Sequence, residues 1–227
     1  MIVITGASRG IGKFLFNSFL NSTKEDIKAI YLKTKPLDNI EKFYQLDLTN
    51  YEQVQFFVET YAEEMKNITL INCAANIQYS FTHKSDPLQW SGIIETNLIG
   101  SYNIIRALLP LMREQKFGRI INFSSVAAIK PSLGVSSYSA SKSALWGLAK
   151  SIAIENASLN ITINNINLGY SELGMIETVT DEFRKDIISQ IPAGFLCPSE
   201  DILNTVNYLR NTRYINGSSI DLNGGLT

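Results

Sequence analysis

Short apolar runs, rich in β-branched residues, alternate along the chain with longer segments in which apolar positions recur at helical spacing. The short runs predict strands at residues 1–5, 28–32, 43–46, 68–72, 118–124, 161–166 and 218–222. Between the first two strands, the spacing predicts a helix with one face on a core, carried by Ile11, Phe14, Leu15, Ser18 and Phe19. The segment after Tyr138 repeats this spacing in Leu145, Leu148, Ala149 and Ile152.

Strands that are apolar on both faces and separated by helices favour right-handed crossovers and a parallel sheet covered on both sides. A chain of 227 residues with 45% hydrophobic content can bury one substantial core, so we expect a single α/β domain over residues 1–227. In such folds ligands bind beyond the carboxyl ends of the strands. The chemistry is therefore expected just after each strand.

The charge balance narrows the classes of partner. With 20 basic and 21 acidic residues the net charge is -1, which gives no general electrostatic reason to bind nucleic acid or an anionic membrane. No apolar run approaches the roughly eighteen residues of a membrane span, and the first residues lead into a strand without the features of a signal peptide. Cys73 and Cys197 lie far apart, so we expect reduced thiols and a cytoplasmic protein. The sole histidine, His83, has no partner cluster typical of a metal site.

A glycine-rich turn follows the first predicted strand directly. In TGASRGIG, the residues Gly6, Gly10 and Gly12 open the first predicted helix. A turn without Cβ atoms lets a diphosphate approach the backbone, and the helix N-terminus offers free N–H groups and a partial positive charge. The alternative is an ordinary strand-to-helix turn, which the strand before it and the amphipathic helix after it disfavour.

The second predicted strand ends in YLKTK, where a site for NAD usually carries an acidic residue for the adenosine ribose. Lys33 and Lys35 stand there instead, and with Arg9 of the glycine-rich turn they form a cage suited to a 2′-phosphate. We therefore expect NADP(H) rather than NAD(H). The alternative is that both lysines are merely solvated.

Tyr138 and Lys142 lie four residues apart on a predicted helix, which puts them on one face with about 6 Å between their Cβ atoms. A free tyrosine has a pKa of about 10, so it exchanges protons poorly at neutral pH unless a nearby cation stabilises the phenolate. Lys142 can be that cation. Ser124 and Ser125 end a strand at the same edge and offer a hydroxyl for a substrate oxygen.

A set of short motifs runs through essentially the whole chain in a fixed order: TGASRGIG, LDLT, NCAAN, Asn97 in ETNLIG, Ser125, YSASK and the closing NGG. This set resembles the short-chain dehydrogenases/reductases. The resemblance implies a Rossmann fold whose seven-stranded parallel sheet has the order 3-2-1-4-5-6-7, with helices on both faces. It implies that Tyr138 is the general acid/base and that Ser125 orients and polarises a carbonyl. Lys142 would grip the nicotinamide ribose and lower the pKa of the tyrosine, and Asn97 would hold a water in the proton relay.

The expected cofactor contacts combine the resemblance with the observations above. They are Gly6, Ser8, Arg9, Gly10, Ile11, Gly12, Lys33, Lys35, Asp47, Leu48, Asn72, Ala74, Tyr138, Lys142, Gly169 and Ser171. Three departures from the family pattern bear on cofactor affinity. Ala75 replaces a glycine, Leu168 replaces a proline, and Leu173 stands where a threonine usually bonds the carboxamide, although Ser171 could compensate.

The function we expect is an NADP(H)-dependent carbonyl reductase, closest within the family to the 3-oxoacyl-[acyl-carrier-protein] reductases. Substrate contacts are expected from Ser125 and Tyr138, and from Gln78 and Tyr170. The alternatives are a reductase of a sugar or another polar carbonyl, and a nucleotide-binding regulatory subunit without turnover. The family usually forms homotetramers or homodimers, and the apolar side of the helix after Tyr138 suits that role or the covering of the sheet.

Overall fold

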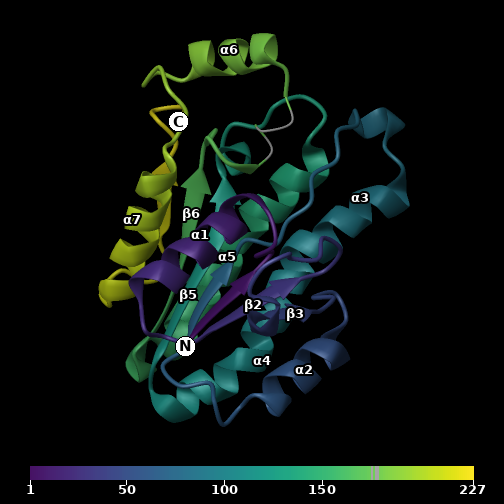
Figure 1. Cartoon of the computed structure of the whole chain (residues 1–227). Helices are drawn as coiled ribbons and strands as arrows, with labels where there is room; N and C mark the ends of the chain where they lie inside the picture. Colours follow the sequence, from purple (N-terminus) through teal and green to yellow (C-terminus); the bar gives the residue numbers. More distant parts are fainter. Residues whose placement is uncertain (175, 177–178) are drawn as a thin grey trace.

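The computed structural model describes residues 1–174, 176 and 179–227. Its strands form one seven-stranded sheet in the order β3-β2-β1-β4-β5-β6-β7, and all neighbouring strands are parallel (Figure 1). The strands are β1 (Ile2–Thr5), β2 (Ile27–Tyr31), β3 (Phe43–Gln45), β4 (Thr69–Asn72), β5 (Gly118–Ser125), β6 (Ile161–Leu168) and β7 (Ser219–Leu222). All seven predicted strands and their expected order are confirmed.

The helices alternate with the strands along the chain. They are α1 (Gly10–Ser22), α2 (Tyr51–Thr60), α3 (Pro87–Ile94), α4 (Gly100–Gln115), α5 (Ser136–Asn156), α6 (Asp181–Gln190) and α7 (Ser199–Asn211). A π-helical turn, η3 (Glu95–Ile99), joins α3 to α4. Short 3-10 turns are η1 (Ile40–Lys42), η2 (Thr82–Lys84), η4 (Val126–Ala128) and η5 (Ala157–Leu159).

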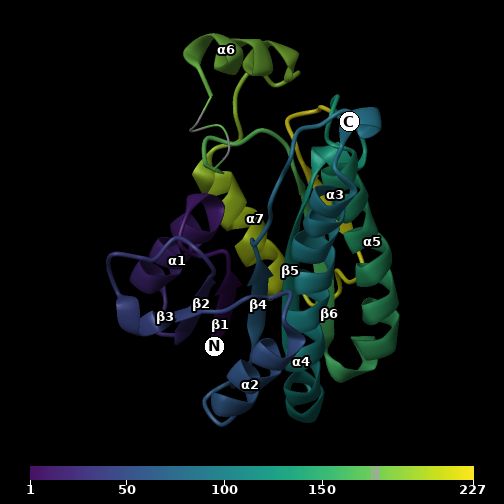
Figure 2. The same ribbon diagram turned by 90° about the vertical axis from the view of Figure 1, so that its right-hand side faces the viewer.

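Two helical layers enclose the sheet. On one face α2, α4 and α5 pack against the strands through a core that includes Phe57, Ile104 and Ile152. On the other face α1 and α7 do so through a core that includes Phe16 and Val206 (Figures 1 and 2). The predicted apolar side of α5 therefore covers the sheet.

The buried stripe of α1 is rotated slightly from the expected one. Leu15, Phe16 and Phe19 are its most buried large side chains, whereas Ile11 and Phe14 are only partly buried at the margin. The general location of the helix against the sheet is nevertheless as the spacing predicts.

Polar side chains occupy the carboxyl half of the sheet on the face that α5 covers. A first polar row runs through residues paired in register on five neighbouring strands, Thr5, Asn72, Asn122, Asn165 and Ser219. Each donates a side-chain hydrogen bond to the next, with 3.4 Å from Thr5 Oγ1 to Asn72 Oδ1 and 2.9, 3.1 and 3.0 Å for the later steps. A second polar row, Ser124, Asn167 and Asp221, lies two residues further along the strands. Because a buried amide is costly unless it is bonded, these rows specify the pairing of the strands.

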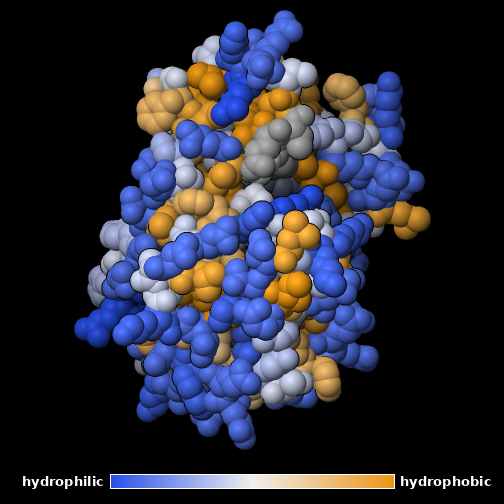
Figure 3. All heavy atoms as spheres, viewed as in Figure 1, coloured by the Kyte–Doolittle hydropathy of each residue, from blue (hydrophilic) through white to orange (hydrophobic). Residues whose placement is uncertain are grey.

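The loops after β1, β4, β5 and β6 meet at the carboxyl edge of the sheet. Helix α6 also lies at this end, apart from both helical layers (Figure 2), and packs there through Ile187, together with Ile191 directly after the helix. Apolar surface gathers at the same end of the molecule (Figure 3). Among the described residues, no helix has both the length and the apolar character that crossing a membrane requires.

Candidate active site

The glycine-rich turn between β1 and α1 is tight enough to exclude side chains. A Cβ on Gly6 would lie 2.8 Å from the Ala74 Cα atom, and one on Gly12 would lie 2.3 Å from the Gly6 carbonyl oxygen. Within the described part of the chain, the N-cap residue Arg9 makes no side-chain hydrogen bond to the first turn of α1. The N-terminal N–H groups of the helix are thus available to an anion, which is what the binding of a diphosphate requires.

The adenosine side of the turn carries the predicted basic residues. Arg9, Lys33 and Lys35 are all exposed, and the backbone N–H of Ala7 donates to the Ile30 carbonyl, which holds the turn beside the end of β2. The structure therefore places a positively charged edge next to the turn.

Asp47 and Leu48 follow β3 in a braced loop. Asp47 Oδ1 accepts hydrogen bonds from the Thr49 backbone N–H at 2.9 Å and from Thr49 Oγ1 at 2.8 Å. The buried Leu48 has its carbonyl bonded to Asn103 Nδ2 of α4 at 2.8 Å. One Asp47 oxygen is thus used within the loop, and among the described residues the other accepts no hydrogen bond, so it can contact a base.

The residues after β4 divide between the sheet and the turn. The side chain of Asn72 lies in the first polar row and so is used within the sheet, whereas Ala74 contacts Gly6 and its N–H donates to Thr5 Oγ1 at 3.1 Å. Burial raises the pKa of the Cys73 thiol to about 12. Cys73 therefore remains a neutral thiol, and both cysteines are free.

Ser125, Tyr138 and Lys142 come together where β5 ends and α5 begins. Tyr138 is 7% exposed and Lys142 3%. Ser125 Oγ accepts the Ala127 backbone N–H at 3.1 Å, which leaves its own proton free to be donated. Lys142 Nζ donates to the Phe123 carbonyl at 2.7 Å and lies 5.6 Å from the centre of the Tyr138 ring.

The surroundings of this group shift the pKa values of Tyr138 and Lys142. Burial raises the pKa of Tyr138, a hydrogen bond with Ser125 acts in the opposite direction, and Tyr79 adds to the rise. The Lys142 ammonium donates to the Phe123 carbonyl, and its expected effect on the pKa of the tyrosine stays a prediction. Burial also lowers the pKa of Lys142 to about 8, with Cys73 opposing it.

Asn97 links the loop after β4 to α5. It is completely buried in the π-helical turn, a type of distortion frequent at functional sites. Its Oδ1 accepts the Asn76 N–H at 2.8 Å, and its Nδ2 donates to the Asn76 carbonyl at 2.9 Å and to Ser141 Oγ at 3.0 Å. Ser141 in turn donates to the Tyr138 carbonyl at 2.7 Å. The Asn97 side chain therefore finds its partners in two other segments rather than within its own helix.

The loop after β6 lies over the glycine-rich turn. A Cβ on Gly169 would be 2.8 Å from the Asn223 Cα atom, and one on Gly10 would be 3.0 Å from the Gly174 Cα atom. Ser171 Oγ donates to the Leu173 carbonyl at 3.0 Å. The hydroxyl expected to replace the missing threonine is thus bonded within its own loop.

The predicted substrate residues do not all face the same way. Gln78 Nε2 donates to Gln89 Oε1 of α3, so its amide is held against that helix. Tyr79 interacts electrostatically with both Tyr138 and Tyr170. Tyr79 thus lies near both Tyr138 and the predicted substrate residue Tyr170.

Trp146 is a residue of this region that the sequence alone did not single out. Its indole N–H donates into the second polar row, to Ser124 Oγ and Asn167 Oδ1. The available signal is its spacing, because Tyr138, Lys142 and Trp146 repeat every four residues on one helical face.

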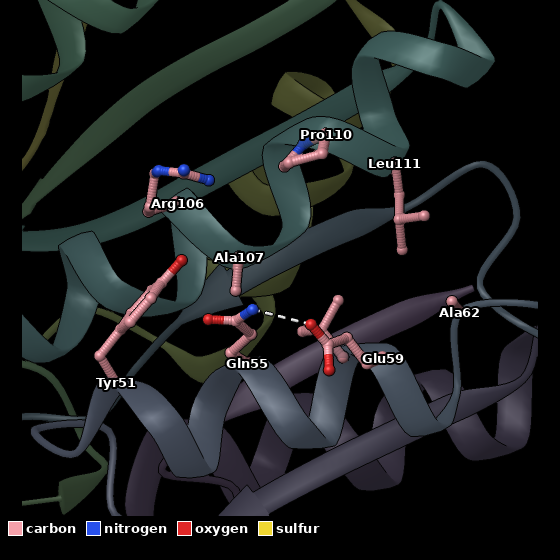
Figure 4. A pocket seen from close by; sticks show the side chains of 9 residues that line it. Tyr51, Gln55, Glu59, Ala62, Arg106, Ala107, Pro110 and Leu111 are labelled. Atoms are coloured by element: carbon pink, nitrogen blue, oxygen red, sulfur yellow. Dashed lines mark hydrogen bonds between the residues drawn. The ribbon is translucent and has the colours of Figure 1, made fainter.

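A separate pocket of about 350 Å³ lies between α2 and α4 (Figure 4). It is lined by Tyr51, Gln55, Val58, Glu59, Ala62, Arg106, Ala107, Pro110 and Leu111. The lining includes none of Ser125, Tyr138 and Lys142. Within the described residues, no group of three or more His, Cys, Asp or Glu side chains is arranged to hold a metal ion.

Comparisons with known proteins point to the same chemistry. A family model described as short chain dehydrogenase matches residues 1–183. The chain is 31% identical over 239 residues to the 3-oxoacyl-[acyl-carrier-protein] reductase FabG of Staphylococcus aureus, covering 99% of this chain and 96% of that protein. It is 33% identical over 233 residues to the acetoacetyl-CoA reductase of Shinella zoogloeoides, covering 98% and 96%. A crystal structure of a 3-oxoacyl-[acyl-carrier protein] reductase from Brucella melitensis superimposes with a TM-score of 0.89 at 25% identity, covering 99% and 90%.

Proposed function

Because this chain belongs to the short-chain dehydrogenase family, we propose that it is an NADP(H)-dependent reductase that interconverts a carbonyl and a secondary alcohol. The observation that carries the proposal is the convergence of Ser125, Tyr138 and Lys142 at the carboxyl edge that also bears the glycine-rich turn. Tyr138 supplies the proton in the reductive direction.

The residues at this edge fit a nicotinamide dinucleotide. Gly6 and Gly12 keep the turn free of side chains, and the uncapped first turn of α1 offers N–H donors for the diphosphate. Asp47 and Ala74 would line the adenosine and central parts, and Gly169 permits the loop after β6 to pass close by. When bound, the nicotinamide supplies or accepts the hydride.

The three catalytic side chains have distinct tasks. Tyr138 is protonated at neutral pH because burial raises its pKa, so it can donate to the oxygen of the reduced carbonyl. Ser125 can donate its hydroxyl proton to that oxygen, because its own oxygen already accepts the Ala127 N–H. Lys142 uses one ammonium proton on the Phe123 carbonyl, and two remain for the ribose and the phenolate. Asn97 holds the loop and α5 together and has a second Oδ1 lone pair for a relay water.

We propose NADP(H) over NAD(H) because the exposed end of β2 presents Lys33 and Lys35 rather than an acidic residue. For the substrate we propose a 3-oxoacyl thioester. Two relatives support this class, the 3-oxoacyl-[acyl-carrier-protein] reductase and the acetoacetyl-CoA reductase. Assaying the same 3-oxoacyl group on a carrier protein and on coenzyme A resolves which acyl carrier the protein accepts.

We further propose a homotetramer or homodimer in the cytoplasm. The outer faces of α4 and α5 expose Tyr102 at 44% and Ile154 at 84%, and such apolar side chains suit a contact between subunits. Both cysteines are free thiols, as in a reducing compartment. Light scattering tests the assembly, and a monomer at micromolar concentration would contradict it.

Two measurements test the proposed function. NADPH binding is followed by fluorescence titration, and turnover is assayed with 3-oxoacyl thioesters, sugars and simple ketones. Tyr138→Phe is expected to bind NADPH as the wild type does and to lose turnover. A fully active Tyr138→Phe protein would refute the assignment, and tight binding without turnover of any carbonyl by the wild type would support a regulatory subunit instead.

A further inference from the structure

Trp146 connects the catalytic helix to two strands at once. It lies one turn after Lys142 on α5, and its indole N–H donates to Asn167 Oδ1 at 2.9 Å and to Ser124 Oγ at 3.1 Å. Asn167 is 2% exposed, and its Nδ2 donates to Asp221 Oδ1 of β7 at 2.7 Å. The chain of hydrogen bonds therefore extends from Trp146 to β7. The N–H thus joins α5 to both β5 and β6.

The same network holds Lys142 at two points. Ser124 Oγ donates to the Lys142 carbonyl at 3.0 Å, and the Lys142 ammonium donates to the carbonyl of the neighbouring Phe123 at 2.7 Å. The backbone and the charged end of this lysine are therefore both fixed to consecutive residues of β5. Any shift of α5 along β5 would disturb both bonds together.

We propose that Trp146, acting with Ser124 and Asn167, is a positioning residue that sets the depth and direction of the Lys142 ammonium. This role rests on the proposed function, in which that ammonium serves the ribose and the phenolate. Within the described residues, the indole N–H of Trp146 bonds Ser124 and Asn167 and none of the groups proposed to react. It acts through Ser124, whose hydroxyl it orients towards the Lys142 carbonyl by occupying the acceptor side of the oxygen.

The position of the ammonium is reported by its own titration. Burial lowers the pKa of Lys142 to about 8, and the titratable groups that face it in the described structure are Cys73 and Tyr138. If α5 loosens, water reaches the ammonium and its pKa moves back towards 10.5. If Trp146 only filled space, replacing it by another aromatic residue would leave the pKa of Lys142 unchanged.

The test is Trp146→Phe, which keeps an aromatic ring and removes the N–H. The Lys142 titration is followed by NMR in protein labelled at lysine, with its resonance assigned by its loss in Lys142→Met. We expect the midpoint to rise by about one unit, a tenfold change in proton affinity. The turnover number should fall, while the KM for NADPH stays near the wild-type value.

Trp90→Phe is the matched control. Trp90 of α3 is the other tryptophan of the chain, and its N–H also donates to a serine of α5, Ser136 Oγ at 3.1 Å. This variant loses an equivalent bond away from Lys142. We expect a lower melting temperature and an unchanged Lys142 midpoint.

A double variant, Trp146→Phe with Asn167→Ala, keeps the test decisive if the single variant folds poorly. It removes the buried acceptor that Trp146→Phe leaves unpaired, so it should regain stability while the Lys142 midpoint stays raised. A wild-type midpoint in the double variant, or an equal rise in Trp90→Phe, would overturn the proposal. Because the NMR titration needs no turnover, it tests the role of Trp146 even if no carbonyl substrate is found.

Discussion

The buried Lys142 ammonium makes the stability of this protein depend on pH in a specific direction. Burial lowers its pKa from 10.5 to about 8. Between these values the unfolded chain holds a proton that the folded chain has released, so the free energy of unfolding rises with pH. The difference of about 2.5 between the two pKa values corresponds to ~3–4 kcal/mol, at ~1.4 kcal/mol per pH unit. This penalty is fully present below about pH 8 and is removed as the pH approaches 10.5.

Lys142→Met removes this titration and isolates its contribution. Urea unfolding of both proteins from about pH 7 to about pH 9.5 should show the wild type gaining about 2 kcal/mol relative to the variant. The subtraction cancels other groups, including Tyr138, whose raised pKa destabilises the fold only at still higher pH. Lys150→Met, an exposed lysine on the same helix, is the matched control and should show a constant difference. A constant difference for Lys142→Met as well, or one of opposite slope, would refute the buried-charge reasoning.

Three further predictions concern the turn, the cofactor and the polar rows. Gly12→Ala places a methyl 2.3 Å from the Gly6 carbonyl, so the melting temperature and NADPH affinity should both fall, and an unaltered titration curve would contradict the close contact. Lys33→Glu with Lys35→Glu should weaken NADPH binding by ~10- to 100-fold while leaving NADH within about twofold, measured by fluorescence, whereas an equal loss for both would argue against a 2′-phosphate site. Asn122→Leu leaves the amides of Asn72 and Asn165 each short of a partner and should cost ~2–4 kcal/mol in urea unfolding, with a neutral effect counting against the row.

The positions of the strands could be predicted from the sequence because each strand is a short apolar run bounded by a turn. The predicted end of β6 was short by two residues, since the pattern of apolar residues stops before Asn167 whereas the strand pairs as far as Leu168. A leucine retains the backbone N–H that a proline would lack, so the ladder can continue to that point. The order of the strands came from the family resemblance, because periodicity does not say which strands are neighbours.

The residues that we propose to react could also be named from the sequence, since their types and spacing are specific, but their orientation could not. Spacing puts Tyr138 and Lys142 on one face, yet it cannot say that the ammonium bonds the Phe123 carbonyl. Likewise, an aromatic residue in an amphipathic helix reads as core, and only the fold reveals that Trp146 meets Asn167. Contacts between residues far apart in the chain depend on packing that no local pattern encodes.

The first polar row also bears on how the chain finds its native pairing. The strands are so rich in isoleucine, valine and leucine that sliding one against another would bury nearly the same apolar area. A slip of one residue would, however, turn Asn72, Asn122 or Asn165 to the opposite face, into the core beneath α1 and α7, with no amide partner. Hydrophobic burial thus drives the sheet to form, while a few amides discriminate among its near-degenerate alignments. The residues that align the carboxyl edge of the sheet are therefore buried amides inside the sheet and not residues of the candidate active site.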